Sequence, residues 1–210
     1  MPMKHCAFII LIFLMTQIVP SRVSAQEIPV SISSALYQIT NEGADTIVVY
    51  LPSFNDQLPA TERELLPFYV FWRLQGHYYY RKYARGVPEG NTPELTDSSI
   101  ADLAAEHFSE IENEEIIEPY YRQIQHGDTV WIMFPPSGSN LKDVFLIQTD
   151  GLRIVKFIEN SSLDAKEYFA DDIYNIHYTV NAGLFTAILR KRIQSVIADL
   201  EKQERIRLKQ

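Results

Sequence analysis

Hydrophobic and polar positions in the first third of the chain form short runs that are typical of β-strands. Residues 35–40 and 46–51 are β-prone runs on either side of the polar stretch 41–45, an arrangement that predicts a hairpin. Residues 59–64 are less regular and predict a turn or a short helix. The early part of the chain is therefore expected to contribute strands to a sheet.

Residues 67–86 read PFYVFWRLQGHYYYRKYARG, an aromatic and basic block without an acidic side chain. Gln75 and Gly76 stand midway between its two halves, as the loop of a two-residue hairpin would. With this loop, Trp72 lies opposite Tyr79 on the more apolar face, which we expect to turn inward. The opposite face is expected to be partly wet, and it pairs Arg73 with Tyr78, Phe71 with Tyr80 and Tyr69 with Lys82.

A connector at residues 86–97 carries Pro and Gly, and a helix is predicted after it. Ser99 and Asp102 have the spacing of a capping box at the start of this helix. Its apolar positions recur at helical intervals, at Ile100, Leu103, Ala104, Phe108 and Ile111. Residues 89–118 contain ten acids and no Lys or Arg, so the outward face of the helix is expected to be strongly negative.

The second half of the chain predicts three more strands and a long helix. Strands are expected at residues 129–134, 144–148 and 152–158, and the last two flank Asp150-Gly151, a strong hairpin signal. Both faces of this hairpin are apolar, so we expect it to be central and covered on each side. The helix starts near Ala182, and its apolar stripe contains Phe185, Ile188, Leu189, Ile193, Val196, Ile197 and Leu200.

Together these patterns predict an α+β fold in a single domain over residues 26–210. The predicted architecture is an antiparallel sheet of about six or seven strands built from hairpins, packed with two helices including the long C-terminal helix. Residues 190–210 carry seven Lys or Arg against three acids, whereas the segment 89–118 is acidic. We expect the two helices to lie side by side with their charged edges facing one another; the alternative is that the basic end of the last helix docks a partner or an anionic surface.

The N-terminus has the pattern of a secretory signal peptide. Lys4 supplies a positive charge, residues 7–15 are apolar, and Val23-Ser24-Ala25 offers the small residues of a cleavage site. This predicts a signal at residues 1–25 and a periplasmic or secreted protein with no transmembrane segment after cleavage. An uncleaved anchor is the alternative, although the apolar run is shorter than the roughly 20 residues of a comfortable membrane span.

Removal of the signal changes the composition in two ways. Cys6, the only cysteine, is lost, so the mature chain has no internal disulfide, which suits a bacterial exported protein better than a small secreted animal domain. Lys4 and Arg22 are lost too, which leaves 17 basic residues against 27 acidic ones and a net charge of about −10. This charge argues against nucleic acid as a partner.

Strong catalytic and cofactor motifs are absent from the sequence, which contains no HExxH, CxxC, P-loop or GxSxG pattern. We therefore expect no cofactor and no metal. His107 and Glu110 lie three apart on the predicted helix, but His107 falls within the apolar stripe and is expected to be a packed core residue. Asp171, Asp172 and His177 could hold a cation, but a loop with a helix cap is the favoured interpretation.

The aromatic and basic hairpin is the best candidate for a binding surface. Tyrosines on a strand bring contact area at low entropic cost, and the cations can contact an anionic group. Tyrosine is also a natural strand residue, and the cations can instead neutralise the acidic helix. The predicted binding residues are Tyr69, Phe71, Arg73, Tyr78, Tyr80 and Lys82.

Three functional hypotheses follow from the sequence. The leading one is an exported, non-catalytic binding or assembly protein of the bacterial cell envelope, whose partner is an envelope protein or a glycan. The alternative is a small secreted hydrolase that acts on a glycan or peptide, with His77, His126 or His177 as its base. A third is a homo-oligomer that associates through the last helix, and the sequence leaves the oligomeric state open.

Overall fold

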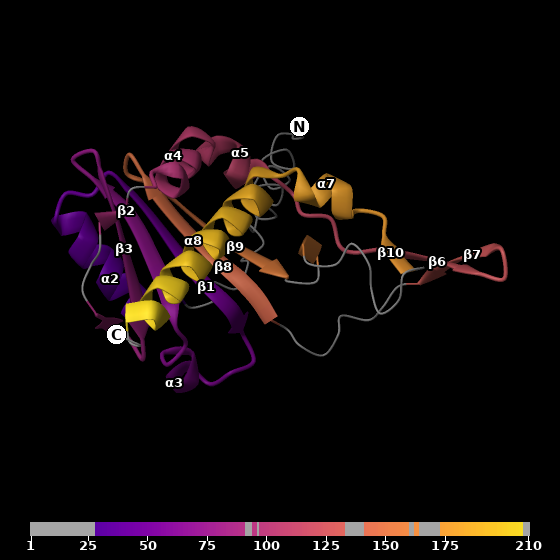
Figure 1. The fold of residues 1–210 in the computed structure, drawn as a ribbon, viewed down its shortest axis with the longest axis horizontal. Coiled ribbons are helices and arrows are strands. Elements are labelled where there is room, and N and C mark those ends of the chain that lie inside the picture. The colour runs from indigo at the N-terminus through magenta and orange to yellow at the C-terminus, as the bar shows by residue number, and fades with distance from the viewer. Residues whose placement is uncertain are drawn as a thin grey trace, which may run out of the picture.

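The computed structural model of the chain describes residues 28–90, 94–95, 97–132, 141–159, 162–163 and 173–207. It has an α+β fold with a large antiparallel sheet, a second small sheet and a long C-terminal helix (Figure 1). The fold class predicted from the sequence is confirmed. The predicted signal peptide at residues 1–25 lies outside the described residues.

The large sheet has seven strands. Six of them follow the order β4-β3-β2-β1-β8-β9, and β5 pairs with β3. Every one of these pairings is antiparallel. The strands are β1 (Thr46–Asn55), β2 (Phe68–Leu74), β3 (His77–Ala84), β4 (Val87–Glu89), β5 (Glu94–Leu95), β8 (Leu141–Thr149) and β9 (Leu152–Glu159).

Helices cover both faces of the large sheet. Helix α2 (Val30–Asn41) packs on one face, and α4 (Ser99–Glu106), α5 (Phe108–Asn113) and α8 (Phe185–Arg207) pack on the other. Side chains of β1 alternate between the two cores, so that Ile47 contributes to the α2 core and Val48 to the α4–α8 core. Burial on both faces explains why the central strands are apolar at successive positions instead of alternating with polar ones.

The two hairpins that the sequence indicates most strongly are confirmed. Every β2–β3 pair is the predicted one, from Phe68 opposite Tyr83 to Leu74 opposite His77. Gln75 and Gly76 have φ angles of 53° and 80°, and two successive positive values favour a tight hairpin turn with the twist of the strands. The Asp150-Gly151 turn has the same signature and joins β8 to β9. Strand β8 is central, as predicted, whereas β9 is an edge strand, which corrects the prediction for that half of the hairpin.

The prediction of a strand at residues 35–40 is wrong, because these residues lie in α2. Ile32, Leu36 and Ile39 recur at helical spacing and are buried against the sheet, and this burial outweighs the β-propensity of the run. Glu64 stabilises the start of α2, since its carboxylate accepts hydrogen bonds from the backbone N–H groups of residues 30 and 31 at 2.5 and 3.0 Å. Desolvation acts to raise the pKa of Glu64, but these hydrogen bonds outweigh it and the pKa is lowered. The predicted turn or short helix at residues 59–64 is confirmed as α3 (Ala60–Arg63).

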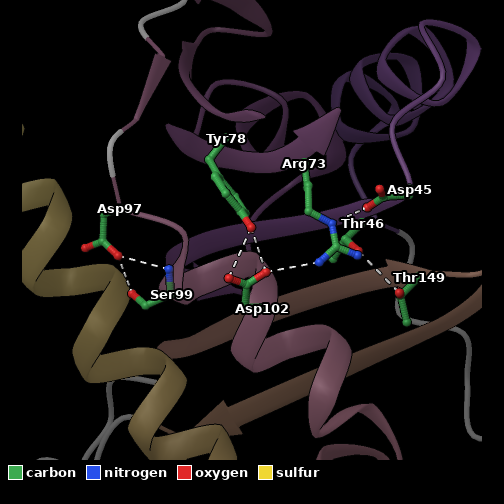
Figure 2. Close-up of polar contacts among 8 residues, drawn as sticks. All are labelled: Asp45, Thr46, Arg73, Tyr78, Asp97, Ser99, Asp102 and Thr149. Carbon is green, nitrogen blue, oxygen red and sulfur yellow. Dashed lines mark hydrogen bonds and ion pairs between the residues drawn. The ribbon is translucent and has the colours of Figure 1, made fainter. Parts of the chain in front are cut away.

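The helix predicted from Ser99 is two short helices that are separated at His107. The predicted capping box is not formed. Asp97 takes the capping role instead, since its Oδ1 accepts hydrogen bonds from the Ser99 backbone N–H at 2.9 Å and from the Ser99 hydroxyl at 2.6 Å. Asp102 is turned toward the sheet, where it contacts Arg73 and Tyr78 (Figure 2).

Helix α8 begins at Phe185, three residues later than predicted, and follows the short helix α7 (Tyr178–Ala182). The Glu114 carboxylate accepts hydrogen bonds from the backbone N–H groups of Phe185 and Thr186, at 2.5 and 2.9 Å. Leu189, Ile193 and Val196 of its predicted stripe are buried within one chain. The guanidinium of Arg192 pairs with Asp97, just before α4, in line with the expected pairing between the basic and acidic segments. The rest of the stripe is covered only in part, since Ile188 is 40% exposed and Phe185, Ile197 and Leu200 are half-buried. The third hypothesis, a homo-oligomer, therefore stays a prediction.

The second sheet projects from the body of the domain, at the right of Figure 1. Its three strands are ordered β10-β6-β7, with bounds Ile173–Asn175, Tyr121–Gln125 and Asp128–Ile132. Asn181 joins the base of the small sheet to the body of the domain. The Asn181 side chain accepts a hydrogen bond from the Ile117 N–H at 3.1 Å and donates to the Ile117 and Ser162 carbonyls. The last two residues of the strand predicted at 129–134 lie outside the described residues.

Candidate functional site

The six predicted binding residues lie on the face of β2 and β3 that α4 and α8 cover. Tyr69 and Phe71 are buried, with 7% and 1% of their surface exposed. The Tyr69 hydroxyl lies 3.5 Å from Glu201 of α8. These two side chains are therefore part of the core and are not open to a second molecule in this structure.

Arg73 and Tyr78 belong to a polar network above β2 and β3 (Figure 2). The guanidinium of Arg73 contacts the Asp45 carboxylate at 2.7 Å and the Asp102 carboxylate at 3.0 Å. The hydrogen bond to Asp45 is the largest of the effects that raise the pKa of Arg73. The Tyr78 hydroxyl donates to Asp102, and the two oxygens of that carboxylate lie 3.0 and 3.1 Å from it. One alternative predicted from the sequence is that the cations of this hairpin neutralise the acidic helix. Arg73 does so, because it pairs with Asp102 of α4.

Lys82 and Tyr80 are only half-buried, as the predicted wet face requires. Lys82 pairs with Glu89 of β4 at 2.9 Å. The Tyr80 ring packs 5.6 Å from that of Phe71, and burial raises the pKa of Tyr80 to about 12. The six residues are thus brought together, but mainly as packing and ion-pair partners of their own chain. Their role in binding a second molecule stays a prediction.

A different aromatic surface is open to solvent, on the projecting small sheet. Trp131 of β7 has 51% of its surface exposed, and its ring stacks on that of Tyr120 with centroids 5.4 Å apart and an angle of 4° between the planes. The His177 ring lies behind Tyr120, with centroids 6.4 Å apart. These three rings form an aromatic cluster at the junction between the small sheet and the body.

Cross-strand pairing shows which other side chains share the face of Trp131. Arg122 is its direct partner on β6, and Ile124 is paired with Thr129 one position further along the same face. All of these side chains are exposed, and Ile124 has 48% of its surface accessible. The aromatic platform is defined here as Tyr120, Arg122, Ile124, Thr129 and Trp131.

The base of the platform contacts the body of the domain. Tyr121, which follows Tyr120, is buried at 2% exposure, and the His177 Nδ1 atom lies 2.9 Å from the Glu118 carbonyl oxygen. Among the described segments, the chain before β6 and the chain after β10 are held to the body near these contacts and at Asn181, so the base of the platform is anchored to the body there.

Sequence reasoning missed this site because β6 was not predicted. The segment YYRQIQHGDTVWI contains a hairpin signal, since His126 and Gly127 have positive φ angles of 52° and 87° between two β-prone runs. Polar residues interrupt β6, so only the second run, residues 129–134, is predicted as a strand. In the sequence, Trp131 was the residue of this segment that could have indicated a binding surface.

The histidines considered as catalytic bases or ligands are spread over the structure. His77 begins β3, His126 lies in the β6–β7 turn, and His177 precedes α7. His107 stacks on Phe185 with ring centroids 3.7 Å apart, and its Nδ1 atom lies 3.6 Å from Glu110, consistent with the packed interpretation. Over the described ranges, no group of three or more His, Cys, Asp or Glu side chains is placed to hold a metal. Asp171 and Asp172 lie outside the described residues.

Comparisons with family models, with curated proteins and with solved structures find no match to this chain. None of the helices in the part of the chain that the structure describes has both the length and the apolar composition needed to cross a membrane. Function is therefore inferred from the chain's own residues and their geometry.

Proposed function

We propose that the chain is an exported, non-catalytic binding or assembly protein of the bacterial cell envelope, and that the aromatic platform on the small sheet is its binding surface. The observation that carries the proposal is the half-exposed Trp131 stacked on Tyr120, on a sheet that projects from the domain. Exposed apolar surface that is ordered and rimmed by polar residues is typical of an interaction site.

The large sheet and its helices serve as the scaffold in this proposal. Each face of the sheet is filled by helices of the same chain, so most of its aromatic side chains are committed to the core. From Arg122 to Trp131 the small sheet contributes mainly exposed residues, among them the apolar side chains of Ile124, Val130 and Trp131. This division of exposed and buried residues supports a stabilising role for the large sheet and a contact role for the small sheet.

Export is supported by the N-terminal sequence. The charged start, the apolar run and the small residues before position 26 fit a cleavable signal, and the chain after position 25 has no cysteine. These features support a binding surface in the periplasm or outside the cell, where envelope proteins and glycans are the accessible partners.

A photo-crosslinking amino acid at Thr129 of the full chain tests the proposal in cells of its native host. Thr129 is exposed on the platform, and the matched control is Tyr37, which is 72% exposed on α2 at the large sheet. We expect the chain to fractionate with the envelope, and a defined crosslinked species to form from position 129 but not from position 37. Retention in the cytoplasm, or equal crosslinking from both positions, would contradict the proposal.

A further inference from the structure

We propose that the aromatic platform binds an acidic polysaccharide, with a sugar ring on Trp131 and a sugar carboxylate on Arg122. The inference rests on the proposed function and goes further, because it names the chemical class of the ligand. It is carried by three features of the platform: an open ring face, an adjacent cation, and further contact surface along the same strands.

The open ring face belongs to Trp131. One face of the indole is covered by Tyr120, in nearly parallel stacking, yet half of the side chain remains exposed. The side chain therefore keeps solvent-accessible surface outside its contact with Tyr120. A flat, rigid and solvent-facing ring suits the C–H face of a sugar, since stacking requires no pocket and an aromatic side chain loses little entropy on binding.

The cation belongs to Arg122. Its side chain is exposed and lies directly opposite Trp131 in the β6–β7 pairing, so the guanidinium and the indole share a face. None of the ion pairs formed among the described residues uses Arg122. A guanidinium offers two parallel N–H donors to a carboxylate, and this geometry favours an acidic sugar over a neutral one.

The mature chain as a whole is acidic, with a net charge of about −10, so an anionic ligand is favoured only locally, by the Arg122 cation on the platform. The other members of the platform, Tyr120, Ile124 and Thr129, are uncharged, and the nearest acid on β7, Asp128, alternates to the opposite face of the sheet. An anionic chain that lies along this face therefore meets a cation and no carboxylate of the platform.

The platform is longer than one ring. Thr129 lies two residues from Trp131, about 7 Å along the strand, and its partner Ile124 adds an exposed apolar side chain there. A polymer can use both positions, with one ring on the indole and the next over the Ile124–Thr129 pair. The ligand inferred for the platform is therefore a polysaccharide and not a single sugar.

The two tryptophans of the chain provide a site-resolved assay. Trp131 is half-exposed, whereas Trp72 is buried at 3% exposure. The indole N–H signal of Trp131 in an NMR spectrum therefore reports on the platform, and that of Trp72 reports on the core. The ¹⁵N-labelled chain, in the form that the cell exports, is titrated with hexamers of galacturonate, glucuronate and mannuronate. We expect the Trp131 signal to shift with at least one of these probes and the Trp72 signal to stay in place.

Variants assign the shift to the platform. Arg122→Gln is expected to weaken binding of the uronate probe about tenfold or more, because a charge-assisted contact is lost. Trp131→Ala is expected to weaken it by at least as much, as measured by calorimetry. The matched controls are Arg205→Gln, which removes an exposed cation on α8, and Tyr37→Ala, which removes an exposed ring on α2, and both should bind as the parent does.

The inference is overturned if none of the uronate hexamers shifts the Trp131 signal, if Arg122→Gln binds as the parent does, or if neutral cellohexaose binds equally well. It is also overturned if a poly-glutamate peptide binds as tightly, because the platform would then recognise acidic polypeptides. Failure of this titration alongside specific crosslinking from Thr129 refutes the ligand class alone. Failure of both experiments refutes the proposed function as well.

Discussion

Replacing Asp143 with alanine is expected to lower the free energy of unfolding by about 3–5 kcal/mol. Asp143 is 1% exposed and lies between the sheet and α8. Its Oδ2 accepts hydrogen bonds from the Tyr50 hydroxyl at 2.9 Å and from the Arg190 guanidinium at 2.5 Å. Its Oδ1 accepts the backbone N–H of Ser53 at 3.1 Å. Removal of the carboxylate takes a counter-charge away from a buried guanidinium and leaves two further donors without this acceptor.

Tyr50 shows how strongly this site is desolvated. Burial, followed by the charge of Asp143, raises the pKa of the Tyr50 phenol above its ordinary value, so the hydroxyl remains a donor. Urea unfolding of the parent, Asp143→Ala, Arg190→Met and the double variant Asp143→Ala/Arg190→Met measures the coupling. We expect the double variant to be more stable than the sum of the single losses predicts. A loss below about 1 kcal/mol for Asp143→Ala, or simple additivity, would contradict the role of this pair in holding α8.

Replacing Phe71 with alanine is expected to cost a similar amount, about 3–5 kcal/mol. Phe71 is 1% exposed, and its ring packs 5.6 Å from the Tyr80 ring in the core beneath α4 and α8. Because such a loss can unfold a domain of ordinary stability, Phe71→Leu provides a milder variant whose urea midpoint remains measurable.

Tyr78→Phe is the matched control for Phe71, since both residues were predicted to bind a ligand from the same hairpin face. Tyr78 is partly exposed and loses only its hydroxyl contact with Asp102, so we expect a loss of about 1 kcal/mol. An unchanged unfolding midpoint for Phe71→Ala would show that this face is not a core, and the aromatic and basic hairpin would regain its claim as the binding surface.

The sequence predicts the sheet of this domain better than its helices. The β2–β3 and β8–β9 hairpins are predicted correctly because their loops contain Gly76 and Gly151 at positions where positive φ is needed, and a two-residue loop fixes the register of the strands. The sequence predicts a strand within α2 because Ile39 and its neighbours have β-propensity. The carboxylate that stabilises the start of the helix belongs to Glu64, which is distant in the sequence. Tertiary contacts decided the outcome there.

The candidate site could be predicted only in part. The composition of residues 67–86 suggests an aromatic surface, but it does not reveal that α8, more than a hundred residues away, covers Tyr69 and Phe71. Conversely, Trp131 stands in a short apolar run, residues 129–134, which the sequence predicts only as one more strand. Its partner Tyr120 lies eleven residues away, and the fold of the β6–β7 hairpin brings the two rings together.

The structure makes the small sheet, and not the β2–β3 hairpin, the accessible aromatic surface of the domain. Oxidative labelling of the folded chain, read by mass spectrometry at each tyrosine and tryptophan, tests this most directly. The structure predicts rapid modification of Trp131, with Tyr37 as the exposed reference, and protection of Tyr69 and Trp72. Protection of Trp131 together with rapid labelling of Tyr69 would contradict the account and return the search for a binding surface to the hairpin.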